Sequence, residues 1–123
     1  MAKILIVDDD VSATELIKKL LSLEGFETTA VNDSTKAIEV TGSIKPDLIL
    51  LDLMMPDING FELCEILQKD PNFSQIPIII LTALDDSKSR AAALNAGAKD
   101  YITKPFRSKE LAQRINALIN KAA

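Results

Sequence analysis

Short apolar runs alternate with amphipathic stretches along the whole chain. Residues 4–7, 48–51 and 78–81 are almost entirely apolar, whereas residues 27–31 and 99–103 are strand-like but carry polar side chains. An uninterrupted apolar run of this length is typical of a parallel strand that is covered on both faces, and polar strands suit the edges of a sheet. The pattern therefore predicts three central strands and two edge strands.

The segments between these strands have the apolar spacing of helices. Ser12-Ala13-Thr14-Glu15 and Asn59-Gly60-Phe61-Glu62 have the form of capping boxes, so we expect helices to begin there. Gly25 would end the first of these helices and Asp70-Pro71 the other. Further helices are expected over residues 34–43, over about 86–96 up to Gly97, and around a final apolar stripe of Leu111, Ile115, Leu118 and Ile119.

Strand and helix thus alternate five times, which predicts an α/β fold with a parallel sheet and helices on both faces. Right-handed crossovers and polar edges favour the doubly wound strand order 2-1-3-4-5. The simple order 1-2-3-4-5 would bury the polar second strand and expose the apolar first one, so we reject it. The 123 residues suffice for one hydrophobic core and are too few for two, so we expect a single domain over residues 1–123.

The composition is that of a soluble globular domain, with 47% hydrophobic and 26% charged residues. The net charge is −4 and the basic residues are scattered, so we expect no direct contact with nucleic acid. No stretch approaches the roughly 20 apolar residues of a membrane span, and the start lacks the form of a signal peptide. A single cysteine, Cys64, suits a reducing cytoplasm. Without histidine, the chain has no histidine-based triad and cannot carry phosphohistidine itself.

Polar side chains collect at the predicted carboxyl ends of the strands, where an open α/β sheet places its functional site. They are Asp8, Asp9 and Asp10 at the end of the first strand, Asp52 at the end of the third, Thr82 at the end of the fourth, and Thr103 and Lys104 at the end of the fifth. One of the three successive aspartates could cap the next helix, but Ser12 is the expected cap. Carboxylates held this close need a cation, and an all-oxygen ligand set favours Mg²⁺. Together with a nearby hydroxyl and ammonium group, these carboxylates predict a binding site for a phosphoryl group.

The segments ILIVDDD, DLILLDLMMPDINGFEL, IPIIILTA and GAKDYITKPF resemble the response-regulator receiver domains of two-component signalling, in order and over about residues 3–117. The resemblance implies a flavodoxin-like fold and a phosphorylation-activated switch. It implies that Asp52 accepts a phosphoryl group from a sensor histidine kinase or a phosphotransfer protein. It also implies that Mg²⁺ is held by Asp8, Asp9, Asp52 and the backbone carbonyl of Met54.

The same resemblance implies roles for residues around the acceptor. Thr82 would be the switch hydroxyl, Lys104 would pair with the phosphoryl group, and the Lys104–Pro105 peptide bond would be cis. Tyr101 would turn inward as the hydroxyl moves, and the surface of the fourth helix, fifth strand and fifth helix would change for a downstream protein partner. Met54 and Leu84 match the variable positions beside the phosphoryl group. Because both are apolar, they predict slow hydrolysis of the phosphoaspartate.

Two alternatives belong to other classes of protein. ILIVDDDV also fits the strand-DxD pattern of haloacid-dehalogenase-like phosphatases, with Asp8 as the nucleophile and Asp10 as the acid. The order of the motifs, an unused Asp52 and the short chain speak against it. The other alternative is a receiver fold that never takes phosphate, but such relatives usually lose an acidic residue, the threonine or the lysine. Whether the chain stands alone or was cut from a longer protein stays open.

Overall fold

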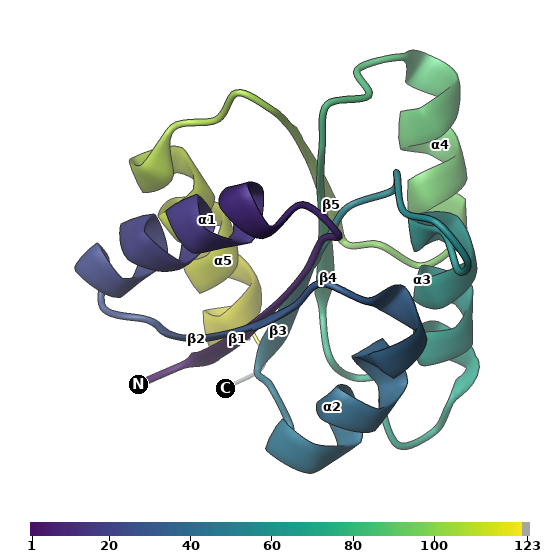
Figure 1. Ribbon diagram of the computed structural model, residues 1–123, viewed down its shortest axis with the longest axis horizontal. Coiled ribbons are helices and arrows are strands. Elements are labelled where there is room, and N and C mark those ends of the chain that lie inside the picture. Colours follow the sequence, from purple (N-terminus) through teal and green to yellow (C-terminus); the bar gives the residue numbers. More distant parts are fainter. Residues whose placement is uncertain (122–123) are drawn as a thin grey trace.

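One sheet of five parallel strands lies between two layers of helices in the computed structural model, which describes residues 1–121 (Figure 1). The strands are β1 (Lys3–Val7), β2 (Glu27–Val31), β3 (Leu48–Leu51), β4 (Ile78–Thr82) and β5 (Asp100–Thr103). Their order is β2-β1-β3-β4-β5, and every neighbouring pair is parallel, which confirms the predicted topology. Within residues 1–121, no helix has the length and apolar character that crossing a membrane requires.

The helices divide between the two faces of the sheet, and each face has its own core. Helices α1 (Val11–Leu23) and α5 (Ser108–Lys121) cover one face, and α2 (Ala37–Ile44), α3 (Gly60–Lys69) and α4 (Ser87–Asn95) cover the other. Successive strand residues point to opposite faces. Ile4 and Ile6 of β1 therefore pack towards α1 and α5, whereas Leu5 and Val7 pack towards the other three helices. This double burial explains why the central strands are apolar throughout.

Several boundaries differ from those that the sequence predicts. The expected second helix is divided into a 3-10 turn, η1 (Ser34–Lys36), followed by α2. The prediction that Ser12 caps the first helix is wrong. Asp10 is the N-cap of α1, because its backbone is still extended and its Oδ1 accepts the Ala13 N–H at 3.2 Å. The cap at Asn59 is confirmed, since its side chain accepts the Glu62 N–H at 3.0 Å.

The carboxyl ends of the strands meet at one edge of the sheet. Val7 is paired with Leu51, so Asp8 and Asp52 leave the neighbouring central strands at the same level. The backbone confirms this, because the Asp52 N–H donates to the Val7 carbonyl at 3.0 Å. On the other side, the Lys104 N–H donates to the Thr82 carbonyl at 2.8 Å. The polar residues that follow separate strands are thereby gathered at the point where the strand order reverses.

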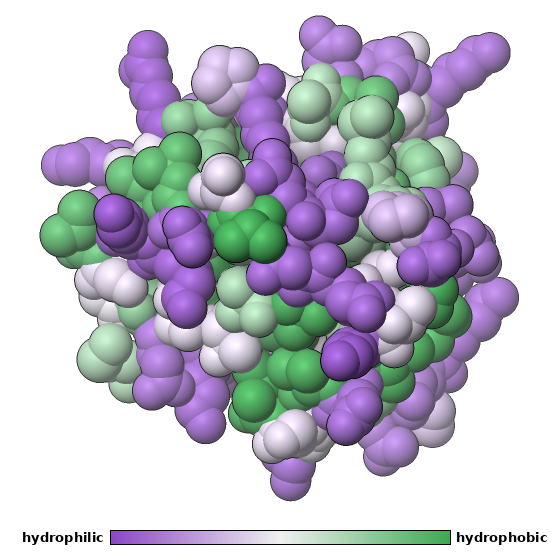
Figure 2. Space-filling view, in the orientation of Figure 1, coloured by the Kyte–Doolittle hydropathy of each residue, from purple (hydrophilic) through white to green (hydrophobic). Residues whose placement is uncertain are grey.

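Helix α1 exposes several hydrophobic side chains. Figure 2 shows green hydrophobic groups among the polar ones in the region that α1 occupies in Figure 1. Val11, Leu16 and Leu23 of this helix are each more than half exposed. Val11 directly follows Asp10, so the hydrophobic surface of α1 begins beside the carboxyl edge of the sheet.

Candidate functional site

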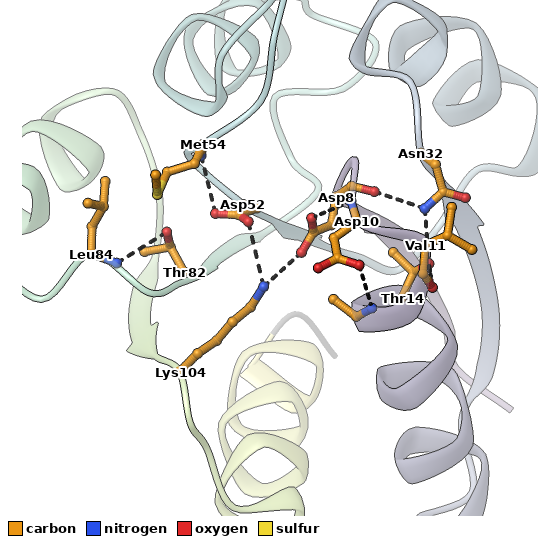
Figure 3. Close-up of polar contacts among 11 residues, drawn as sticks. Asp8, Asp10, Val11, Thr14, Asn32, Asp52, Met54, Thr82, Leu84 and Lys104 are labelled. Carbon is orange, nitrogen blue, oxygen red and sulfur yellow. Dashed lines mark hydrogen bonds and ion pairs between the residues drawn. The ribbon is translucent and has the colours of Figure 1, made fainter.

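The ammonium group of Lys104 lies between two buried carboxylates (Figure 3). Its Nζ is 2.8 Å from Oδ2 of Asp8 and 3.5 Å from Oδ2 of Asp52. Asp8 is 3% exposed and Asp52 is 9% exposed, so both are largely removed from water. Two carboxylates share one ammonium, which leaves the cluster with an excess of negative charge.

The electrostatics of this cluster are those of an incompletely neutralised site. Burial raises the pKa of Asp8 above its ordinary value of 3.8, and the nearby Asp52 raises it further, against the hydrogen bonds from Lys104 and Asp10. Burial alone would lower the pKa of Lys104, but the carboxylates of Asp8 and Asp52 outweigh it and raise that pKa. Lys104 is therefore firmly protonated at neutral pH, while the negative charge on Asp8 is only partly compensated.

Each carboxylate is also held by the backbone that follows it. Oδ1 of Asp8 accepts the Asp10 N–H at 3.0 Å, and Oδ1 of Asp52 accepts the Met54 N–H at 3.2 Å. One oxygen of each group thus faces the ammonium and the other faces its own loop. This arrangement fixes both side chains in orientation as well as in position.

The three successive aspartates have different positions. Asp8 is in the cluster, Asp10 caps α1, and Asp9 is exposed to solvent. Within residues 1–121, no three acidic, histidine or cysteine side chains lie close enough together to hold a metal ion. The structure thus brings together two of the three predicted carboxylate ligands and leaves Asp9 outside. The donors are all oxygens with excess negative charge, a set that still fits a hard divalent cation.

Thr82 and Tyr101 are connected through the backbone of Leu84. Thr82 is fully buried, and its hydroxyl accepts the Leu84 N–H at 3.4 Å. The hydroxyl of Tyr101 donates to the Leu84 carbonyl at 2.7 Å, and the Arg90 guanidinium lies 4.8 Å from the centre of the Tyr101 ring. Tyr101 is 2% exposed, so its side chain is already turned inward in this structure. The Lys104–Pro105 peptide bond is cis.

Three residues near the acidic cluster are not among the candidates from the sequence. A Cβ atom on Gly60 would overlap the Asp52 carbonyl oxygen and lie 2.6 Å from Cα of Leu53, so only glycine allows this approach of α3. Asn32 and Ser34 follow β2 and contact loops of the site from there. The signal that could have found them is their place directly after a strand, because the carboxyl ends of all five parallel strands meet at the same edge of the sheet.

A model of the response regulator receiver domain matches residues 4–116. The chain belongs to this family. A curated relative, the DNA-binding response regulator MtrA of Mycolicibacterium paratuberculosis, is 43% identical over 119 residues, which cover 97% of this chain and 52% of the relative. The regulator RpaA of Synechocystis is 36% identical, and the matched residues cover 50% of its length. The chain therefore spans about half the length of the curated relatives it matches.

Solved structures of receiver domains have the same fold. The receiver domain of the Francisella response regulator 1452 is 36% identical with a TM-score of 0.91, and each chain is covered completely. A putative response regulator from Chloroflexus aurantiacus is 32% identical with a TM-score of 0.92, with 97% of this chain and 98% of that chain covered.

Family membership determines the general function of the receiver domain. It is a phosphorylation-activated switch of two-component signalling, and response regulators of this kind work with histidine kinases. The domain is thus a regulatory phosphoacceptor. The phosphatase alternative is set aside, because the family model extends from the first strand into the last helix.

Proposed function

We propose that Asp52 is the residue of this receiver domain that accepts the phosphoryl group. The observation that carries the proposal is the cluster in which Asp52 and Asp8 share the ammonium of Lys104. Asp8 is the more buried carboxylate and the one bound more closely by Lys104. Asp52, with its longer contact of 3.5 Å, keeps an oxygen freer to act as a nucleophile.

The proposed reaction needs little covalent chemistry from the protein. A carboxylate oxygen of Asp52 forms a bond to phosphorus while the N–P bond of a partner's phosphohistidine breaks, and the electron pair of that bond returns to the imidazole. Lys104 stabilises the negative charge of the transferring group, and the hydroxyl of Thr82 supplies a hydrogen bond from the neighbouring strand. Positioning and charge compensation are most of what phosphoryl transfer requires.

Mg²⁺ is part of the proposal. Asp8, Asp9, Asp52 and the carbonyl of Met54 would hold the ion, which would offset the negative charge that Lys104 leaves uncompensated. The excess negative charge and the all-oxygen donors of the cluster support Asp8 and Asp52 as ligands, whereas Asp9 would have to turn towards the ion from solvent.

The proposed output is a changed surface of α4, β5 and α5. Phosphorylation adds roughly −1.5 to −2 charges, which attract Lys104 and the hydroxyl of Thr82. Movement of Thr82 would reach Tyr101, because both are bound to the backbone of Leu84. From Tyr101 it would reach α4, whose Arg90 lies over its ring. This surface would meet a protein partner or an attached effector domain.

The phosphoryl donor is proposed to be a sensor histidine kinase or a phosphotransfer protein in the cytoplasm. The chain itself contains no histidine, so a phosphohistidine has to come from another chain. The exposed hydrophobic side chains of α1 begin beside the acidic edge at Val11 and offer a surface for such a protein. The free, buried thiol of Cys64 is consistent with a reducing compartment.

The experiment that tests this proposal is chemical phosphorylation without a kinase. The domain incubated with a small acyl phosphate and Mg²⁺ is expected to gain one phosphoryl group per chain. Tandem mass spectrometry of the tryptic peptide that spans Asp52 would locate the group. A phosphoryl group on another residue, or none at all, would refute Asp52 as the acceptor.

Replacement of Met54 by asparagine is expected to shorten the lifetime of the phosphorylated domain by about tenfold. Hydrolysis needs a water molecule oriented towards phosphorus, which an amide can hold by a hydrogen bond and a thioether cannot. Met54 is 57% exposed, and it binds Asp52 through its backbone N–H, so a change of side chain should leave the acceptor in place. The measurement is the decay of phosphorylated protein after the donor is removed.

Met54→Leu is the matched control, since it keeps an exposed apolar side chain and should leave the lifetime unchanged. Leu84 is less suitable for this test, because it packs against the core and its backbone binds both Thr82 and Tyr101. Equal decay of Met54→Asn and the parent protein would mean that access of water is limited elsewhere.

A further inference from the structure

The connection between β2 and α2 contacts both loops that carry the acidic cluster. Asn32, the first residue after β2, donates from Nδ2 to the carbonyl of Asp8 at 2.9 Å and to Oγ1 of Thr14 at 3.0 Å. Two residues later, the hydroxyl of Ser34 contacts the loop that follows Asp52. A segment of three residues therefore joins the backbone of one carboxylate to the loop of the other.

Ser34 makes the more unusual of these contacts. Its side chain is buried, with 4% of the residue exposed, although the rest of the connection is exposed. Its Oγ donates to the Pro56 carbonyl at 3.0 Å and accepts the Ile58 N–H at 3.3 Å. One hydroxyl thus binds two backbone groups on either side of Asp57, whose φ of 65° lies in the left-handed region. Few non-glycine residues adopt this conformation, although aspartate is one that tolerates it, and the two hydrogen bonds to Ser34 help to hold the backbone there.

The loop that Ser34 holds also orients the acceptor. It begins at Met54, whose N–H binds Oδ1 of Asp52, and it ends at Asn59, the N-cap of α3. Between these residues the backbone is neither helix nor strand. Asp8 and Asp52 repel each other across a single ammonium, so their loops need contacts that keep the two carboxylates from moving apart. The end of β2 is itself fixed, because Asn32 is bound to the Asp8 carbonyl and Asp33 accepts the Thr35 N–H at 3.0 Å.

We propose that Ser34 is a positioning residue for phosphorylation, which holds the loop after Asp52 in the geometry that the acceptor needs. The proposal rests on Asp52 being the phosphoryl acceptor. Ser34 does not touch the reacting atoms; it acts through Pro56 and Ile58 on the backbone that orients Asp52. Small misplacements of a reacting group reduce the rate of transfer strongly, so the loss of this hydroxyl should be measurable in the rate.

The test compares Ser34→Ala with Thr41→Val. Both variants remove one buried hydroxyl, but the hydroxyl of Thr41 binds only the Ala37 carbonyl of its own helix, at 2.7 Å. Two quantities are measured at a temperature where every variant is fully folded. They are the hydrogen exchange rate of the Ile58 amide and the rate constant of phosphorylation by a small acyl phosphate.

For Ser34→Ala we expect the Ile58 amide to exchange about tenfold faster and phosphorylation to be about tenfold slower. Thr41→Val should change neither quantity, although it should lower the stability to a similar extent. An unchanged phosphorylation rate in Ser34→Ala, with or without faster exchange, would show that the hydroxyl is only structural and would overturn the proposal. An equal loss of rate in Thr41→Val would overturn it as well. If the parent protein takes no phosphoryl group on Asp52, the proposed function itself fails first.

Discussion

Asp52→Asn is expected to lower phosphorylation by a small acyl phosphate at least about a hundredfold, which in practice means no detectable modification. The amide has almost the shape of the carboxylate and retains an oxygen for the Met54 N–H, but it is not a nucleophile. The substitution also removes one of the two like charges beside Lys104, so the free energy of unfolding should be unchanged or higher. Loss of modification would therefore not result from loss of the fold. Intact-mass measurement after incubation with donor and Mg²⁺ records the outcome.

Asp57→Asn is the matched control for this prediction. Asp57 lies in the same loop and is exposed, and its left-handed backbone is one that asparagine tolerates well. This variant should be phosphorylated as readily as the parent protein. Modification of Asp52→Asn at the parental level would instead move the acceptor to another carboxylate, and Asp8 would be the first to test.

Lys104→Ala is expected to lower the free energy of unfolding by about 2 kcal/mol at neutral pH. Removing one partner of a buried ion pair leaves the other charge uncompensated, and Asp8 has only 4% of its side chain exposed. The loss should be smaller than for a fully buried pair, because 24% of the Lys104 side chain is exposed. The control is Lys109→Ala on α5, an exposed lysine whose removal should change stability by less than about 0.5 kcal/mol.

The pH dependence of this loss has a definite sign. Burial already raises the pKa of Asp8, so the folded state retains its proton to a higher pH than the unfolded state. This group therefore lowers stability as the pH rises from 3.8 through its folded pKa. Without Lys104 that pKa rises further, so the difference between Lys104→Ala and the parent should shrink when the pH is lowered from about 7 to about 5.

Urea unfolding at the two pH values measures the effect, and the double variant Asp8→Asn/Lys104→Ala separates its cause. With no carboxylate left at position 8, most of the stability lost in Lys104→Ala should return. A loss that is independent of pH, and that Asp8→Asn does not restore, would mean that Lys104 stabilises the fold by packing of its alkyl chain instead.

The strand order, the sheet edge of the site and the membership of a family could all be predicted from the sequence. Continuous apolar runs mark strands that are buried on both faces, and this is a local property that the chain carries wherever it folds. Once the order is known, the residue after each strand is known to lie at the same edge. For this reason Asp8, Asp52 and Lys104 could be named before their contacts were visible.

Contacts between distant segments were decided only by the tertiary structure. Asp10 takes the cap that Ser12 was expected to fill, because β1 ends and α1 begins closer together than the capping motif suggests. Asp9, next to Asp8 in the sequence, is left in solvent. Gly60 and Ser34 act on a loop that no periodicity connects with them, and their importance comes from distances to the backbone of Asp52, Pro56 and Ile58. Local sequence patterns specify which functional side chains lie at this edge of the sheet. The orientation of those side chains depends on packing and hydrogen bonds between segments that only the folded chain brings together.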